Sequence, residues 1–147
     1  MTEPIWKTPF TVQAMNQFGR NTANAHLGIE ITEAGPDYLI GRMPVDARTK
    51  QPAGILHGGA SVLLAETLAS FGGTFVVDAA IHAVVGQEIN ANHLRPATGG
   101  WVTGTARPVH IGRRSQVWEI HIRGDDGKLV CISRMTAAVL SKPSEYK

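Results

Sequence analysis

Residues 54–70, GILHGGASVLLAETLAS, constrain the fold of this chain more than any other segment. They are residues that form helices readily, and apart from His57 the only ionisable side chain among them is that of Glu66. A helix on a protein surface carries several charges along its exposed face, whereas a core helix carries almost none. The segment therefore predicts a buried central helix, around which a strongly curved antiparallel sheet wraps, and Glu66 needs an explanation.

The low-charge stretch continues to Val77 but does not predict a membrane span. His57, Glu66 and two glycine pairs interrupt it, so no apolar run approaches the roughly 20 residues that a bilayer requires. The whole chain has 147 residues, of which 43% are hydrophobic and 18% charged, as is typical of one globular domain. We expect an ordered core over residues 5–140 and a frayed tail over residues 141–147.

Charge and cysteine content exclude several classes of protein. A net charge of +2 does not favour nucleic-acid binding, and the N-terminus lacks the apolar run of a signal peptide. The single cysteine, Cys131, excludes a disulfide framework and suits a reducing compartment. The six histidines lack the spacing of metal ligands. We therefore expect a cytoplasmic protein that has no metal and no membrane or nucleic-acid partner.

Alternating apolar residues predict strands before and after the central helix, which makes the chain α+β. In one strand Val85, Ile89 and His93 should share a face, and Pro108 should mark a bulge or an edge in another. Trp101, Trp118 and Cys131 are expected to be packing residues. The predicted elements are a short amphipathic helix over residues 11–18 and strands over residues 26–34, 38–45, 83–95, 101–112, 114–123 and 128–140.

Glu66 and the entry of the central helix are the candidate catalytic groups. Ser70 lies one turn beyond Glu66 on the same helix face, and an acid among apolar neighbours suits a general base or a nucleophile. The alternative is a structural carboxylate bonded to a backbone group. The backbone N–H groups of Gly58 and Gly59, at the positive end of the helix dipole, could form an oxyanion hole. The alternative there is an ordinary glycine-rich loop.

The spacing of these groups predicts quaternary structure. Glu66 lies eight residues beyond Gly58, which is roughly 12 Å along a helix, so one carbonyl group cannot reach both. If the two groups act together, they come from two antiparallel copies of the helix related by a two-fold axis.

Basic residues gather farther along the chain. His93 and Arg95 end one strand, and a second group lies near the following turn, at Arg107, His110, Arg113, Arg114 and Ser115. Arginine side chains match phosphate oxygens well, so these residues could hold the phosphorylated end of a ligand. The alternative is a solvated charged face.

Three segments together resemble a known family. They are MPVDARTKQPAGILHGGASVLLAETLAS, GQEINANHLRP and PVHIGRRSQVW, and the likeness extends from about Ile5 to Leu140. They resemble the hotdog-fold acyl-CoA thioesterases of the phenylacetate-degradation type. Within that group they are most similar to bacterial 1,4-dihydroxy-2-naphthoyl-CoA thioesterases and aryl-carrier-protein proofreading thioesterases.

The resemblance implies hydrolysis of an acyl-CoA or acyl-carrier-protein thioester, with an aromatic acyl group. It implies that Glu66 is the nucleophile or general base, that the Gly58 N–H polarises the carbonyl, and that Gln51, His57 and Ser70 position thioester and water. No cofactor is implied, because coenzyme A is part of the substrate. A homodimer with shared active sites, assembled further into a homotetramer, is expected. The implied substrate contacts are Gly86, His93, Leu94, Arg95, Pro96, His110, Ile111, Gly112, Arg113, Arg114 and Ser115.

Two other functions remain compatible with the same fold. A hydroxyacyl dehydratase also uses a histidine and an acid, but it leaves Gln51 unexplained. A regulator that only binds acyl-CoA would not need Glu66 or Gln51, and both are present.

Overall fold

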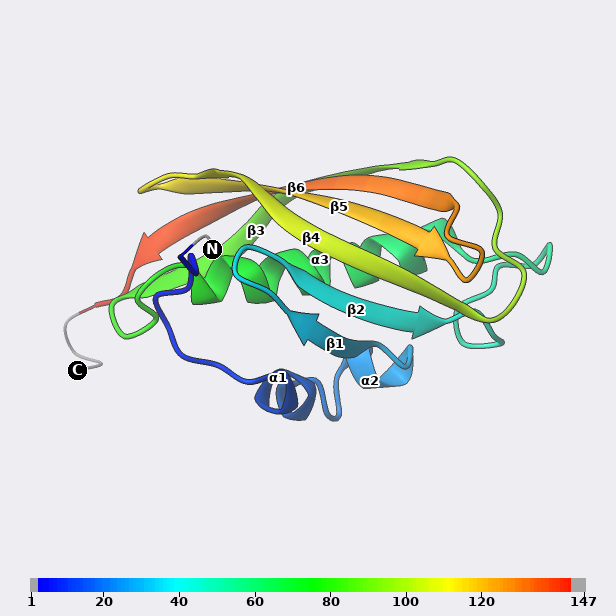
Figure 1. The fold of residues 1–147 in the computed structure, drawn as a ribbon, viewed down its shortest axis with the longest axis horizontal. Coiled ribbons are helices and arrows are strands. Elements are labelled where there is room, and N and C mark those ends of the chain that lie inside the picture. The colour runs from blue at the N-terminus through cyan, green and yellow to red at the C-terminus, as the bar shows by residue number, and fades with distance from the viewer. Residues whose placement is uncertain (1–2, 144–147) are drawn as a thin grey trace.

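The computed structural model describes residues 3–143 and shows a six-stranded antiparallel sheet that curves around one long helix (Figure 1). The sheet order is β1-β2-β4-β5-β6-β3, so β1 and β3 are its edges. This confirms the predicted α+β class and the wrapped central helix. The strands are β1 Glu30–Ala34, β2 Leu39–Pro44, β3 His82–His93, β4 Trp101–Ile111, β5 Ser115–Gly124 and β6 Leu129–Ser141, and the helices are α1 Val12–Phe18, α2 Ala23–His26 and α3 Gly58–Phe75.

Helix α3 is covered by the sheet on one side only. Its buried side packs closely, because Leu68 lies against Gly41 of β2 and Gly104 of β4, where a Cβ atom would come within 2.9 Å of the leucine methyl groups. The opposite face, which includes Glu66 and Ser70, is only half-buried. No helix within residues 3–143 is long and apolar enough to cross a membrane, in keeping with the sequence prediction.

The prediction of a strand over residues 26–34 is wrong at its N-terminal end. His26 belongs to α2, and β1 begins only at Glu30. The Thr22 side chain caps α2 by accepting a hydrogen bond from the Asn24 N–H, and Gly28 turns the chain with a φ of 70°. A helix of one turn leaves no periodic signal in a sequence, which is why residue pattern alone did not reveal it.

A β-bulge in β3 overturns the predicted face of Val85. The pairing of β3 with β6 shifts register between Gly86 and Glu88, so Gln87 is an extra residue that interrupts the alternation. As a result Val84 packs towards the core together with Ile89, whereas Val85 is 46% exposed. The bulge predicted near Pro108 is confirmed, because the pairing of β4 with β5 shifts between Pro108 and His110.

The packing roles predicted for three side chains are largely confirmed. Trp118 and Cys131 are fully buried, and burial raises the pKa of the Cys131 thiol. Trp101 is only half-buried, and the Arg42 guanidinium lies 4.2 Å from the centre of its ring. In the predicted tail, Ser141 is still part of β6, and residues 144–147 lie outside the described residues.

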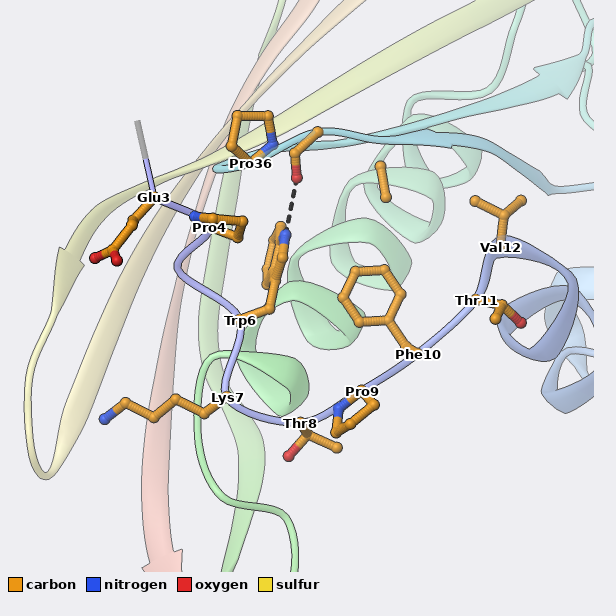
Figure 2. A pocket seen from close by; sticks show the side chains of 12 residues that line it. Glu3, Pro4, Trp6, Lys7, Thr8, Pro9, Phe10, Thr11, Val12 and Pro36 are labelled. Atoms are coloured by element: carbon orange, nitrogen blue, oxygen red, sulfur yellow. Dashed lines mark hydrogen bonds between the residues drawn. The ribbon is translucent and has the colours of Figure 1, made fainter. Parts of the chain in front are cut away.

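The N-terminal segment, residues 3–11, forms a strap over the C-terminal end of α3. The backbone N–H groups of Lys7 and Thr8 both donate to the Phe75 carbonyl, and the Trp6 indole donates to the Gly35 carbonyl at 2.8 Å. Figure 2 shows the Trp6 and Phe10 rings turned inward from this strap. A hollow of about 1050 Å³ lies between the strap and the β1–β2 turn, and no predicted site residue lines it.

Candidate functional site

The entry of α3 leaves one backbone donor free. His57 is the N-cap, and its Nδ1 accepts a hydrogen bond from the Gly59 N–H at 2.8 Å. The N–H groups of Ala60 and Ser61 both donate to the His57 carbonyl. Within residues 3–143 the Gly58 N–H has no hydrogen-bond partner. It therefore remains available at the positive end of an 18-residue helix, where a negatively charged oxygen is stabilised.

Gly58 also lets a second segment approach the helix entry. A Cβ atom at this position would lie 2.6 Å from Nε2 of His93, which comes from the end of β3, so a larger residue would have to displace the imidazole. Gln51 lines the same hollow, and its Oε1 accepts a hydrogen bond from the Ala53 N–H. This helix-entry hollow measures about 410 Å³ and is lined by Gln51, Gly58, Ser61, His93, Leu94, Arg95, Pro96 and neighbouring apolar residues.

Glu66 faces a different hollow on the uncovered side of α3. This Glu66 hollow measures about 400 Å³, and its wall includes Ser70, Phe71 and Thr74 from the same helix. A Cβ atom at Gly86 of β3 would lie 3.0 Å from Oε1 of Glu66, so the carboxylate sits directly against the backbone beside the bulge. No group within residues 3–143 donates a hydrogen bond to it, so the structure does not support the reading of Glu66 as a carboxylate tied to the backbone of its own chain.

The predicted catalytic residues thus form two groups within one chain. Gln51, Gly58 and the His93 ring meet at the N-terminus of α3, while Glu66 and Ser70 lie farther along the helix. Neither hollow contains members of both groups. The separation expected from the helical rise is therefore visible as two distinct cavities.

The predicted basic residues are also divided. His93 is opposite Cys131 in the sheet, whereas Ser115 is opposite Ala138, which in turn pairs with Val85. Seven residues of β6 separate Cys131 from Ala138, or roughly 23 Å. In Figure 1 the β4–β5 turn lies at the left end of the sheet and the segment after β3 at the right. The two groups of basic residues therefore lie at opposite ends of the sheet within one chain.

Within the β4–β5 turn, the backbone is fixed and the cationic side chains are exposed. The Gly112 N–H donates to the Ser115 carbonyl, and the Arg114 carbonyl accepts from the Val139 N–H of β6, each at 2.9 Å. Arg113 and Arg114 extend into solvent, as do His110 and Ile111. Arg107 does not belong to this group, because its guanidinium binds Asp37 at 2.6 Å and lies over the Tyr38 ring.

Comparison with known proteins assigns the family. A model of the thioesterase superfamily matches residues 53–131, which span the whole of α3 and most of the sheet. The chain belongs to the thioesterase superfamily. The 1,4-dihydroxy-2-naphthoyl-CoA hydrolase of Escherichia coli K12 is 48% identical to this thioesterase. The match covers 92% of the present chain and 99% of the Escherichia coli protein.

Two further relatives agree with this assignment. The proofreading thioesterase EntH of Cronobacter turicensis is 48% identical, over 92% of this chain and 98% of its own. The crystal structure of a thioesterase from Haemophilus influenzae superimposes with a TM-score of 0.91 at 50% identity, covering 93% of this chain and 95% of that one. The protein therefore has the hotdog fold and is a thioester hydrolase, and the dehydratase and the non-catalytic regulator are set aside.

Sequence patterns missed five residues of this thioesterase that line the Glu66 hollow: Asn24, Leu63, Thr67, Phe71 and Thr74. Asn24 reaches it from α2, and Thr67 follows Glu66 on α3. The Thr67 hydroxyl donates to Oδ1 of Asn24 at 3.0 Å. Thr67 could have been found, because it is four residues from both Leu63 and Phe71 on one helix face. Asn24 could not, since nothing in its local sequence links it to a helix 43 residues away.

Proposed function

We propose that this thioesterase hydrolyses an acyl-CoA that carries an aromatic acyl group, using Glu66 of one subunit and the Gly58 N–H of another. The observation that carries the proposal is the pair of unpartnered groups on α3. A free backbone donor stands at the helix entry, and a carboxylate without a donor stands eight residues later. These are the two groups that thioester hydrolysis needs, and the name of the Escherichia coli relative supports a CoA thioester.

The chemistry follows from the roles of the two groups. The Gly58 N–H binds the thioester oxygen as negative charge develops on it. Glu66 either takes a proton from a water molecule that attacks the carbonyl carbon, or attacks that carbon itself to form a mixed anhydride, which water then hydrolyses to release the acid and restore the carboxylate. In both cases the tetrahedral intermediate expels the CoA thiolate, which is a good leaving group, so no serine–histidine pair is required. Gln51 and His57 orient the thioester and the water, and Ser70 supports the hydrolytic step on the Glu66 side.

The free edge of the sheet offers the way to join the two groups. Strand β3 is 12 residues long, and no strand within residues 3–143 pairs with its outer side. Such an edge is a template for pairing with a second chain. Antiparallel pairing of two β3 strands with Gly86 opposite the partner copy of His93 places the two-fold axis between Ile89 and Asn90.

This pairing would bring the Glu66 hollow of one subunit against the helix-entry hollow of the other, because Gly86 touches Glu66 and His93 touches Gly58. The two basic segments, which are far apart in one chain, would then also approach each other across the axis. The coenzyme A contacts that we propose are Gly86, His93, Leu94, Arg95 and Pro96 with His110, Ile111, Gly112, Arg113, Arg114 and Ser115.

Substitution of Glu66 tests the chemistry. Glu66→Gln keeps the size of the side chain but can neither attack nor accept a proton, so kcat for benzoyl-CoA should fall by about 10²–10⁴ with little change in KM. Release of free thiol measures the rate. The matched control is Glu33→Gln, which removes a carboxylate that is hydrogen-bonded by Tyr38 outside both hollows. A Glu66→Gln enzyme with near-normal kcat would exclude Glu66 as the acting carboxylate.

Mixing two inactive variants tests the shared site. Chains with Glu66→Ala and chains with Gly58→Pro are unfolded together, refolded and allowed to pair at random. Each heterodimer has one site with both lesions and one with neither, so the mixture should regain roughly a quarter of wild-type activity by symmetry. If heterodimers demonstrated by mass spectrometry remain inactive, each site lies within one chain and the proposed pairing is wrong.

A further inference from the structure

Behind the Glu66 hollow lies a second, smaller cavity, here named the inner hollow. It measures about 190 Å³ and lies between α1, α2, β1 and α3. Its walls are largely apolar, with Met15 and Ile31 almost fully buried and Ile29 and Phe71 partly buried. An engineered apolar cavity of about 150 Å³ binds benzene, so the inner hollow is large enough for one aromatic ring.

Three residues belong to the walls of both cavities: Asn24, Thr67 and Phe71. Asn24 and Thr67 are joined by the hydrogen bond from the threonine hydroxyl to Oδ1, so α2 is fastened to α3 at this point. On its other side the Asn24 side chain packs against the end of α1, where a Cβ atom at Gly19 would lie 3.4 Å from Cβ of Asn24. The asparagine is therefore held in place between the two cavities.

Of the other polar side chains that line the inner hollow, Asn16 and Glu30 are already paired, Glu30 with Arg42 at 2.9 Å, and Arg20 is exposed. Asn16 exchanges two hydrogen bonds with the backbone of Ile31, at 2.8 and 2.9 Å, so its side chain does not need a polar ligand. An apolar or aromatic group that entered this space would leave the hydrogen bonds between Asn16 and Ile31 intact, and would break only the one between Thr67 and Asn24. The partition formed by Asn24 and Thr67 is what separates that space from Glu66.

We infer that the Asn24–Thr67 pair sets how long an acyl group the enzyme accepts, by closing the inner hollow to the ring farthest from the thioester. The inference rests on the proposed function, since it places the acyl group in the Glu66 hollow. A single-ring acyl group fits in front of the partition. A fused two-ring group must displace Asn24 to extend into the inner hollow, and it gains the burial of its second ring only when it does so.

The test compares benzoyl-CoA with 2-naphthoyl-CoA. Asn24→Ala removes the partition, so the ratio of kcat/KM for naphthoyl-CoA to that for benzoyl-CoA should rise at least tenfold, the order of discrimination that apolar pockets achieve for small size differences. Thr67→Val keeps the shape of the side chain but frees Asn24 to swing, and the ratio should rise in the same direction by less. A merely destabilised enzyme would lose activity on both substrates equally.

The matched control is Thr103→Ala, which shortens an exposed threonine of β4 that lines neither hollow. It should leave the ratio within about twofold of wild type. The preference is also measured without turnover, as the ratio of the Kd values of the two thioesters for enzymes that carry Glu66→Gln in addition. If Asn24→Ala leaves both ratios unchanged, the partition has no role in selection. If instead wild type and Glu66→Gln hydrolyse thioesters equally, the proposed function itself fails.

Discussion

Substitution of Gly58 by proline and by alanine separates the backbone donor from the space around it. Both changes add a Cβ atom that would lie 2.6 Å from Nε2 of His93, which is about 0.8 Å closer than an ordinary contact, so both must push the imidazole aside. Only proline also removes the N–H group. The difference in activity between the two variants therefore reports the loss of that donor together with the Cδ methylene group that replaces its hydrogen.

The structure indicates that the proline variant will fold. Gly58 is the first residue of α3, where proline is favoured, and its N–H makes no hydrogen bond within residues 3–143. The N-cap His57 has a φ of −69° and a ψ of 128°, which is the extended conformation that a residue before proline prefers. We expect the melting temperatures of the two variants to agree within a few degrees.

The expected activities follow from these contacts. Gly58→Ala should lower kcat by up to about 10², because the His93 side of the site shifts. Gly58→Pro should lower it by a further factor of about 10²–10³, the usual cost of losing one oxyanion donor. Thiol release at saturating benzoyl-CoA measures both values. Equal kcat values for the two folded variants would show that the Gly58 N–H does not bind the thioester oxygen, and the oxyanion assignment would have to be abandoned.

Two further outcomes follow from other parts of the molecule. Arg114→Ala, and to a lesser degree Arg95→Ala, should raise KM for CoA thioesters, and this increase should become smaller when salt is added. Hydrolysis of thioesters that lack the nucleotide should barely change. Equal loss of activity on both kinds of substrate would contradict a phosphate contact. Gly72→Ala should lower the melting temperature, because the added Cβ atom would lie 2.7 Å from the fully buried Trp118 ring. Overpacking of this kind destabilises a fold by about 1–3 kcal/mol, which exceeds what alanine gains over glycine in helix propensity. Gly99→Ala, where no atom lies within 4 Å, is the control and should leave it unchanged or slightly higher.

Some features were readable because they depend on local pattern. The low charge of residues 54–70 identified α3, and the regular alternation of Trp118, Ile120 and Ile122 identified a strand with one buried face, all of which is confirmed. Helical rise alone predicted that Gly58 and Glu66 are too far apart to share one carbonyl, and the two hollows agree with that separation.

Other features were hidden because they arise from contacts between distant segments. The bulge at Gln87 shifts the alternation of β3 by one residue, and only the pairing with β6 reveals it. The two groups of basic residues are close in sequence, and that closeness does not show how far apart they lie in the fold. Antiparallel pairing sends them to opposite ends of the sheet, since a strand of this length carries the chain across the whole molecule.

By itself, then, the sequence determined the elements and the chemistry of the central helix, because periodicity, capping and residue type act over a few neighbouring positions. Only the tertiary structure decided which groups meet. It left the Gly58 N–H beside His93 without a partner among residues 3–143, set Glu66 against Gly86, and fastened Asn24 of a one-turn helix to Thr67 of α3. These juxtapositions depend on strand register and on packing between segments far apart in the chain, and no local pattern encodes either.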